Sequence, residues 1–314
     1  MKKYILKRTL LLIPTCIGAF IFLFLIYSIM PGSVLDCSLN NIKNQDKIET
    51  KYNINSPRYV KFIVMTKKIF TGKLEMYNLN IAADPVYVMP IILTLAKSNL
   101  ILIFSVIIVG IIVSIPLGII LSRKRNSIIL RLIIYFFMSI PSYILAIVIN
   151  HIFKNGSIYY NYVNSHSTMQ IVNFNYGLKN FIIYFTLSVM YIGHFTKRVN
   201  VAINDVKTKQ FVTTAIAYGF SKRLVEYKYI LKNILVSIIT FVGSSFSVIF
   251  AELIVVQSIL NDTDGFGAFL LKMTFDRQYD AVFACLIITM IIVVVGNYLA
   301  DLFYFAVDPR IKAS

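Results

Sequence analysis

The sequence of 314 residues is poor in charge and in cysteine: charged residues make up 14% of it, and it has three cysteines and no tryptophan. Soluble domains carry about 25% charged residues. Hydrophobic residues reach 58% and the mean hydropathy is +0.74, so the composition predicts a protein that folds in lipid. Disorder is excluded because it requires low hydrophobicity. A disulfide-stapled scaffold is excluded because three cysteines are too few.

Motifs for nucleotide and metal chemistry are missing as well. The chain has no G-x-x-x-x-G-K-[ST] phosphate loop, no H-E-x-x-H and no C-x-x-C. His151 and His166 have no thiolate or carboxylate near them, so they make a weak metal site, and His194 is expected to pack between helices. We therefore expect no catalytic residue, metal or cofactor in this chain.

Long apolar runs with at most one charged residue each are what the sequence does contain. A bilayer core of about 30 Å needs roughly 20 helical residues. Runs of about this length lie at 9–30, 98–122, 132–153, 177–196, 233–260 and 281–307. The first run belongs to segment 1–30, a polar segment covers 31–97, and the other five runs lie in 98–314. The sequence predicts an all-α membrane protein with six transmembrane helices.

The distribution of basic residues predicts the orientation. The net charge is +17, and 18 Lys and Arg lie in segments 1–8, 123–131, 197–232 and 310–314, against four in 154–179 and 260–280. Cytoplasmic loops carry the excess of Lys and Arg. Both termini are therefore expected in the cytoplasm, with 31–97 outside. The basic residues mark topology and contact with anionic lipid rather than nucleic acid.

Two carboxylates, Glu252 and Asp301, lie within the apolar runs. Proton-driven transporters need ionisable side chains inside the membrane. These two are expected near opposite faces of the bilayer, too far apart to form a relay. If the chain moves a solute, the energy source is therefore expected on another polypeptide.

The stretch 211–240, FVTTAIAYGFSKRLVEYKYILKNILVSIIT, resembles the cytoplasmic coupling loop of ABC-importer permeases. Small alanines let a short helix sit closely in a partner's groove, and glycine supplies a turn that a Cβ would hinder. The coupling loop, taken as 197–232, would then dock on an ATPase; the alternative is a solvated basic loop. The residues that the resemblance assigns to ATPase coupling are Thr213, Thr214, Ala215, Ala217, Gly219, Phe220, Ser221 and Lys222.

The C-terminus resembles the dipeptide, oligopeptide and nickel branch of the same family, in particular its B-type subunit. Shorter matches are IPLG at 115–118 and SIPSY at 139–143, and the resemblance covers essentially the whole chain. The signature residues are Asn297, Asp301, Tyr304, Asp308, Pro309 and Arg310. The spacing i, i+4, i+7 of the first three places them on one helical face, where a hydrogen-bonded seam is favoured over a substrate site. The implied fold is that of a type I ABC importer permease.

The sequence departs from the family pattern at four positions. Ile216 and Tyr218 stand where Arg and Lys are usual, Tyr229 where His is usual, and Gln257 where Glu is usual. These departures fit either an ATPase adapted to this chain or a diverged paralogue.

Five further residues are assigned to a translocation path, an interface or a turn. Glu252 is either a path-lining acid that touches a cationic or peptide amino group, or the partner of a cation on a second permease or the outer loop. Ser139 and Pro141 are path or interface residues, with the proline kinking its helix. Gly265 and Gly267 are expected to form a tight outer turn where a delivery protein docks.

The resemblance implies the non-catalytic transmembrane subunit of an ATP-driven importer for peptides, nickel or metal chelates in a bacterial cytoplasmic membrane. Implied partners are a second homologous permease, two ATPases that carry ATP and Mg²⁺, and an extracytoplasmic solute-binding protein. Two other classes stay open: a stand-alone secondary transporter or channel, and a membrane scaffold without transport.

Overall fold

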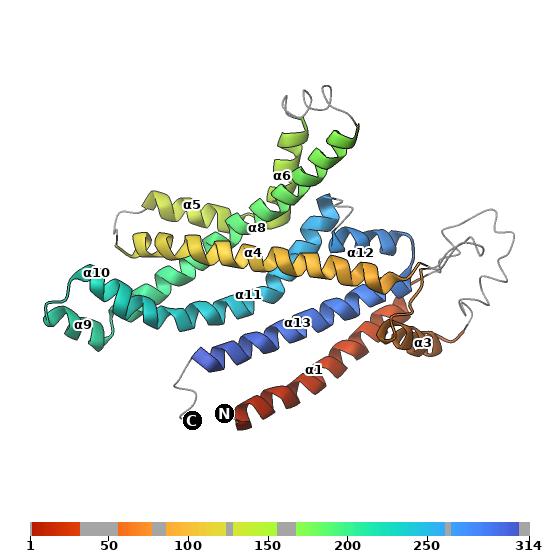
Figure 1. The fold of residues 1–314 in the computed structure, drawn as a ribbon, viewed down its shortest axis with the longest axis horizontal. Helices are drawn as coiled ribbons and strands as arrows, with labels where there is room; N and C mark the ends of the chain where they lie inside the picture. Colours follow the sequence, from red (N-terminus) through yellow and green to blue (C-terminus); the bar gives the residue numbers. More distant parts are fainter. Residues whose placement is uncertain are drawn as a thin grey trace. The chain divides into compact units, whose positions relative to one another are not determined.

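The computed structural model describes residues 2–31, 56–76, 86–123, 128–155, 168–260 and 265–307, which are almost entirely helical (Figure 1). The chain divides into two compact units. Unit 1 contains Met1–Leu100 and Asn261–Val295, and unit 2 contains Ile101–Leu260 and Gly296–Ser314. The all-α class predicted from the sequence is confirmed for the described residues.

The elements follow the apolar runs of the sequence. In chain order they are α1 Lys2–Ile29, α3 Arg58–Phe70, α4 Val88–Arg123, α5 Ile128–Ser139, α6 Ser142–Asn155, α8 Thr168–Lys207, α9 Gln210–Ala217, α10 Lys222–Leu224, the π-helix η2 Val225–Ile230, α11 Leu231–Leu260, α12 Phe266–Phe275 and α13 Tyr279–Val307.

Four helical stretches of the described chain are long and apolar enough to cross a membrane: Arg8–Ile29, Val88–Arg123, Lys222–Leu260 and Tyr279–Phe303. A fifth span results if the bent pair α5 and α6 counts as one. α8, which contains the expected span 177–196, is not among them because residues such as Lys179, Asn180 and His194 lower its apolarity. The chain is thus a multi-pass membrane protein, and the count of six spans stays a prediction.

The expected third span, 132–153, is not one continuous helix. It is broken between Ser139 and Ser142, and α5 and α6 meet at 94°. Pro141 lacks a backbone N–H and disfavours helical geometry in the residue before it, so the helix ends there. The Pro141 carbonyl then accepts the N–H groups of Ile144 and Leu145 at 3.1 and 3.2 Å, which starts α6. The predicted kink is therefore a full break.

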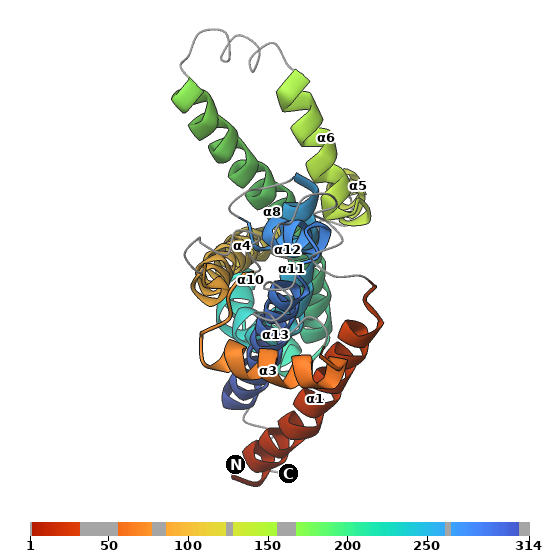
Figure 2. The same cartoon turned by 90° about the vertical axis from the view of Figure 1, so that its right-hand side faces the viewer.

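Unit 1 is held together by an aromatic cluster. α3 crosses the C-terminal half of α1 (Figure 2). The ring of Phe62 packs edge-on against Phe20, Phe24 and Phe283, with centroids 5.1, 4.7 and 4.9 Å away. Such edge-to-face pairs are preferred by the ring quadrupoles. The cluster joins α1, α3 and α13, so part of segment 31–97 is ordered against transmembrane helices.

A short backbone bridge precedes α4 in unit 1. Around the bridge between Glu75 and Tyr87, the Val88 N–H donates to the Leu74 carbonyl at 2.9 Å and ties α4 to the segment before it.

The expected tight turn at Gly265 and Gly267 is wrong. Gly265 is extended, with φ −92° and ψ 140°, and precedes α12, which includes Gly267. Both glycines are buried.

Unit 2 is centred on α11, which packs against α8 and α6, while α5 packs on α8 (Figure 1). At the end where α8 leads into α9, a buried aliphatic cluster joins α8, α9, η2 and α11. Its members are Val199, Ala202, Ile203, Val212, Ala215, Val225, Ile230, Ile234 and Ile238. Through this cluster the coupling loop packs directly against the long helices α8 and α11.

α11 and α13 pack closely at Gly243. A Cβ at this position would lie 2.3 Å from the Ala300 Cβ and 3.4 Å from its Cα. Because the Ala300 Cβ is fixed to its backbone, the two helices would have to separate. We expect Gly243→Ala to lower the free energy of unfolding by about 1–3 kcal/mol, measured as thermal unfolding in detergent. Gly18→Ala is the control, since a Cβ there meets nothing within 4 Å. Equal loss of stability in both variants would contradict the close approach.

Candidate functional site

The coupling loop folds as a helix, a turn and a second helix. α8 ends at Lys207, α9 ends at Ala217, and α10 continues through η2 into α11 (Figure 1). Gly219 has φ +83° and makes the turn. Ser221 then begins α10, and its hydroxyl oxygen accepts the N–H of Leu224 at 3.4 Å. The order of helix, glycine break and helix that the sequence predicts is thus present.

A substitution at Gly219 tests this turn. A Cβ at Gly219 would meet nothing within 4 Å, so only its positive φ resists a side chain. Non-glycine residues cost about 1–2 kcal/mol in left-handed geometry, although Asn tolerates it. We expect Gly219→Val to speed trypsin cleavage after Lys222 and Arg223, while Gly219→Asn leaves the cleavage rate near that of the unchanged protein. Equal cleavage of both variants would show that the turn does not depend on the backbone of this residue.

α9 has one face that packs on its own chain and one that is exposed. Val212 and Ala215 are 2% and 4% exposed and belong to the aliphatic cluster. Ala215 therefore does not sit in a partner's groove, as the sequence suggested, because it is buried in the aliphatic cluster where α9 packs on η2 and α8. The remaining residues assigned to coupling are exposed: Thr213, Thr214, Ala217, Gly219, Phe220, Ser221 and Lys222.

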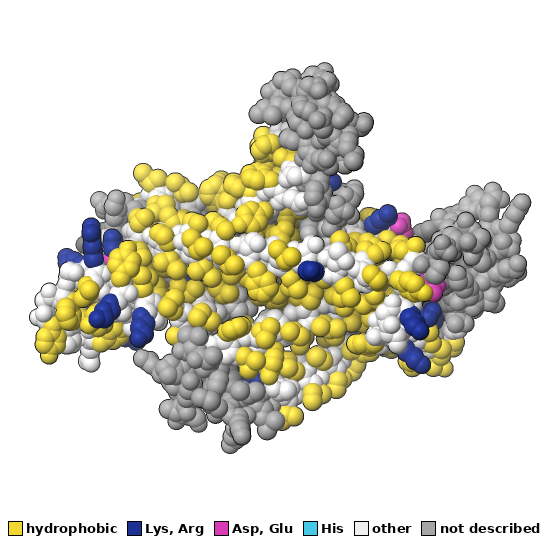
Figure 3. Space-filling view, in the orientation of Figure 1, with side chains coloured by type: hydrophobic (Ala, Val, Ile, Leu, Met, Phe, Trp, Pro, Cys, Tyr) yellow, Lys and Arg dark blue, Asp and Glu magenta, His cyan; other side chains and the backbone are white. Residues whose placement is uncertain are grey.

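The exposed face of this loop carries large apolar side chains. Tyr218 is 79% exposed and Ile216 is 50% exposed, with Phe211 and Phe220 beside them in the sequence. Tyr218 and Ile216 are two of the departures from the family pattern. Lys and Arg side chains gather at the same end of the unit, at the left of Figure 3. Exposed aromatic residues rimmed by charge are typical of a protein interface.

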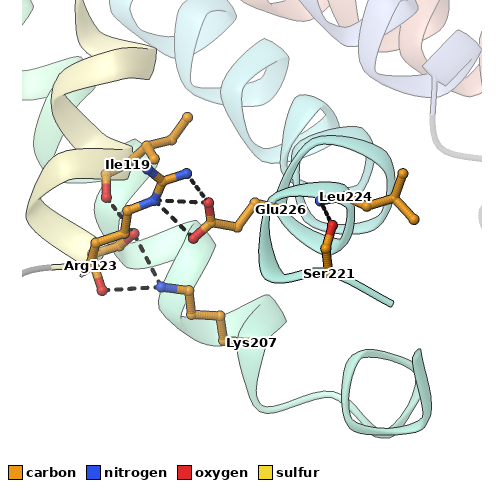
Figure 4. Close-up of polar contacts among 7 residues, drawn as sticks. Ile119, Arg123, Lys207, Ser221, Leu224 and Glu226 are labelled. Atoms are coloured by element: carbon orange, nitrogen blue, oxygen red, sulfur yellow. Dashed lines mark hydrogen bonds and ion pairs between the residues drawn. The ribbon is translucent and has the colours of Figure 1, made fainter. Parts of the chain in front are cut away.

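An ion pair ties the coupling loop to α4. The guanidinium of Arg123, the last residue of α4, donates from Nε to both carboxylate oxygens of Glu226, at 3.1 and 2.8 Å, and from Nη2 to Oε2 (Figure 4). The Glu226 side chain is only 15% exposed, whereas that of Arg123 is 43% exposed. Such bidentate pairs fix geometry as well as charge. No sequence pattern indicates this pair, because the two residues are 103 positions apart.

Lys207 joins the same end of α4 from the last turn of α8. Its ammonium donates to the carbonyl and the hydroxyl oxygen of Ser122 at 3.1 and 3.2 Å (Figure 4). Burial lowers the pKa of Lys207, the nearby Glu226 opposes that shift, and Arg123 adds to it. The ends of α4 and α8 and the start of η2 are thus held together by polar contacts, which we name the Arg123–Glu226–Lys207 cluster.

Glu226 lies within the π-helix Val225–Ile230. π-helical turns are rare and occur mostly as single turns at functional sites. Here the turn lies between the short α10 and the long α11. It places Val225 and Ile230 in the aliphatic cluster while Glu226 points towards α4.

Glu252 lies at the break of the expected third span. Its carboxylate accepts hydrogen bonds from the hydroxyls of Ser142, the first residue of α6, and Tyr191 of α8. Within the described residues, its Oε2 has no hydrogen-bond partner. Ser139, two residues before Pro141, instead donates to the Tyr135 carbonyl at 2.6 Å. Both hypotheses for Glu252 require a cation, whereas these contacts are hydroxyls, so both stay predictions.

One of the C-terminal signature residues makes a described contact between helices. The Asn297 side-chain oxygen accepts a hydrogen bond from the Ser247 hydroxyl of α11 at 2.6 Å. Asp301 lies one turn further along α13 and has a polar partner. The side chain of Tyr304, and all of Asp308, Pro309 and Arg310, lie outside the described residues. The contact of Asn297 is of the kind expected for a structural seam.

The described residues do not form a metal site. No group of three His, Cys, Asp or Glu side chains able to hold a metal ion occurs among them. His166 lies outside this part of the chain.

Comparison with known proteins places the chain in a family. The model of the family described as "Binding-protein-dependent transport system inner membrane component" matches residues 107–313. The chain is 25% identical to the oligopeptide transport system permease protein AppB of Bacillus subtilis, over 99% of the chain and 100% of AppB. It is 24% identical to the dipeptide transport system permease protein DppB of Alkalihalophilus pseudofirmus, over 99% and 100% of the two chains.

A solved structure shows the same fold. A chain of the MetNI methionine ABC transporter, in an inward-facing conformation, matches 70% of this chain and 97% of its own length, with a TM-score of 0.52 and 16% identity. The family match covers the coupling loop, the broken span and the last two long helices. The chain therefore belongs to the family of binding-protein-dependent transport system inner membrane components.

Proposed function

We propose that this chain is the transmembrane subunit of an ATP-driven importer of peptides. The observation that carries the proposal is the exposed face around Tyr218, because it is joined through the Arg123–Glu226–Lys207 cluster and the aliphatic cluster to the long helices. An ATPase that binds this face could move α4, α8 and α11 together. Relatives aligned over their full length are named oligopeptide and dipeptide permeases, which favours peptides over nickel or metal chelates.

The mechanism that we propose is alternating access. Two ATPases bind ATP and Mg²⁺ and approach each other, and the two coupling loops above them move with them. Arg123 and the aliphatic cluster pass this movement to the helices, which open outward. Coupling requires that the ATP-bound ATPases and the loaded binding protein favour the same conformer. ATP is hydrolysed on the partner subunits, and this chain makes and breaks no covalent bond.

The assembly that follows has four kinds of subunit. This chain pairs with a second homologous permease, two ATPases bind below, and an extracytoplasmic binding protein delivers the peptide above. Both termini and the coupling loop lie in the cytoplasm, as the excess of Lys and Arg in these segments supports. Segment 31–97, with α3, then lies outside. The binding protein selects the solute.

Reconstitution tests the proposal. The chain is placed in liposomes alone, or together with the second permease, the ATPases and the binding protein, and uptake of a labelled peptide is measured. We expect ATP-dependent uptake by the complete assembly and none by the chain alone. Uptake by the chain alone, driven by an ion gradient, would indicate a secondary transporter or channel. Unchanged uptake by cells that lack the chain would indicate a scaffold.

A further inference from the structure

A cavity lies beside the Arg123–Glu226–Lys207 cluster. Its volume is about 590 Å³, and it is formed by the ends of α4 and α8 together with α9, α10 and η2. The residues that line it are Ser122, Arg123, Lys207, Val212, Ile216, Lys222, Arg223, Val225, Glu226 and Ile230. All of the lining residues belong to unit 2. The lining combines aliphatic side chains with an excess of cations.

The described residues that line this cavity carry more positive than negative charge. Arg123 pairs with Glu226, which is the only carboxylate in the lining. Lys207 donates to Ser122, a neutral group. Lys222 and Arg223 have no carboxylate within ion-pair distance among the described residues. Three cations therefore surround an open volume, and an anion placed in it would be held by several of them at once.

The position of the cavity along α4 matches the headgroup region of a bilayer. The uncharged run of α4 covers 98–122, which corresponds to about 37 Å of helix against a hydrocarbon core of about 30 Å. Arg123 therefore lies at the level of the lipid headgroups. Exposed aliphatic residues of α4, such as Ile112 and Ile120, lead along the helix to this point and offer a surface for an acyl chain.

We propose that this cavity binds the headgroup of an anionic phospholipid. Lys207, Lys222 and Arg223 contact the phosphate, while the exposed Ile216 contacts the glycerol and the upper acyl chain. Basic pockets at the cytoplasmic ends of transmembrane helices are suited to anionic headgroups, and the aliphatic lining distinguishes a lipid from a free anion. The inference requires only that the chain spans a membrane, so it goes beyond the proposed import of peptides and can fail separately.

The absence of tryptophan from the chain gives a direct test. Ile216→Trp places the only tryptophan of the chain at the cavity, where it can be excited selectively over the tyrosines, and the full-length protein is put into nanodiscs of phosphatidylcholine and phosphatidylglycerol. In one sample phosphatidylcholine carries bromine on its acyl chains, and in the other phosphatidylglycerol does. Quenching of the tryptophan fluorescence is compared between the two samples at equal mole fraction of brominated lipid. We expect stronger quenching by brominated phosphatidylglycerol. Adding Lys222→Gln and Arg223→Gln should lower the affinity for that lipid roughly 30-fold.

A matched control is the double substitution Lys67→Gln and Lys68→Gln in α3, which also removes two adjacent cations and should leave the quenching unchanged. Equal quenching by the two brominated lipids overturns the proposal. Displacement of the lipid by inorganic phosphate or by an acidic peptide also overturns it, in favour of a free anion or a protein partner. Native mass spectrometry gives a second readout without the tryptophan: retained phosphatidylglycerol should be lost on Lys222→Gln with Arg223→Gln, and its persistence contradicts the site.

Discussion

Tyr218→Asp is expected to weaken the binding of the ATPase to this chain strongly. Tyr218 is 79% exposed at the end of α9 and is the most exposed aromatic side chain of the coupling loop. Central aromatic residues commonly contribute about 2 kcal/mol or more to an interface, so the dissociation constant should rise at least about 30-fold. Because the Tyr218 side chain is exposed and its backbone N–H contact with the Thr214 carbonyl does not depend on the side chain, the variant should fold normally. Co-purification of the two subunits from membranes measures the effect.

Tyr59→Asp is the matched control, since Tyr59 is 60% exposed and lies on α3 in the other unit. It should leave ATPase binding unchanged. A surface substitution is a sharper test than deletion of 213–222, because the deletion also removes Ala215 from the aliphatic cluster and would damage the fold. If Tyr218→Asp retains full binding, the docking face lies elsewhere on the chain.

Reversing the charge of Glu226 is expected to uncouple ATP hydrolysis from uptake. Glu226→Arg replaces the partner of Arg123 with a third cation beside Lys207. Hydrogen bonds to charged groups contribute about 1.5–3 kcal/mol, and reversal adds repulsion. We therefore expect peptide uptake by the reconstituted assembly to fall at least about tenfold. ATP hydrolysis should persist, because α9 and Tyr218 still present the docking face.

A double variant that exchanges the two charges tests whether the ion pair itself is responsible for the loss of uptake. Arg123→Glu combined with Glu226→Arg restores the pair in the opposite sense and should recover most of the uptake. Asp205→Arg is the control: Asp205 is an exposed carboxylate at the same end of α8, without an ion pair among the described residues. It should leave uptake near the unchanged level. Failure of the double variant to recover, with both proteins folded, would show that the ion pair does not transmit the movement.

Some features of the coupling loop could be predicted from sequence patterns and others could not. Gly219 could be assigned to a turn because a glycine between two helical stretches indicates a break, and its φ of +83° agrees. The two alanines could not be told apart by pattern. Ala215 packs inward and Ala217 is exposed, because the rotation of α9 about its axis is set by its contacts with η2 and α8. Tyr218 was notable only as a departure from the family, although its exposure makes it the leading docking residue.

The break between α5 and α6 also could not be predicted from the local sequence alone. Pro141 indicated a distorted helix, but a proline in an apolar run produces either a mild kink or a full break, and local sequence does not distinguish them. The break is supported by groups from other helices. Glu252 of α11 and Tyr191 of α8 meet at Ser142, and these residues lie far apart in the chain.

The sequence by itself determined the environment, the helical class and the family, because hydrophobic run length, charge placement and short motifs are local or additive properties. Tertiary structure alone decided which residues face one another: the pair Arg123 and Glu226, the inward turn of Ala215 and the cationic cavity beside them. These depend on the rotation and crossing of packed helices, and that packing is settled by the sum of many distant contacts, which no single stretch of sequence contains.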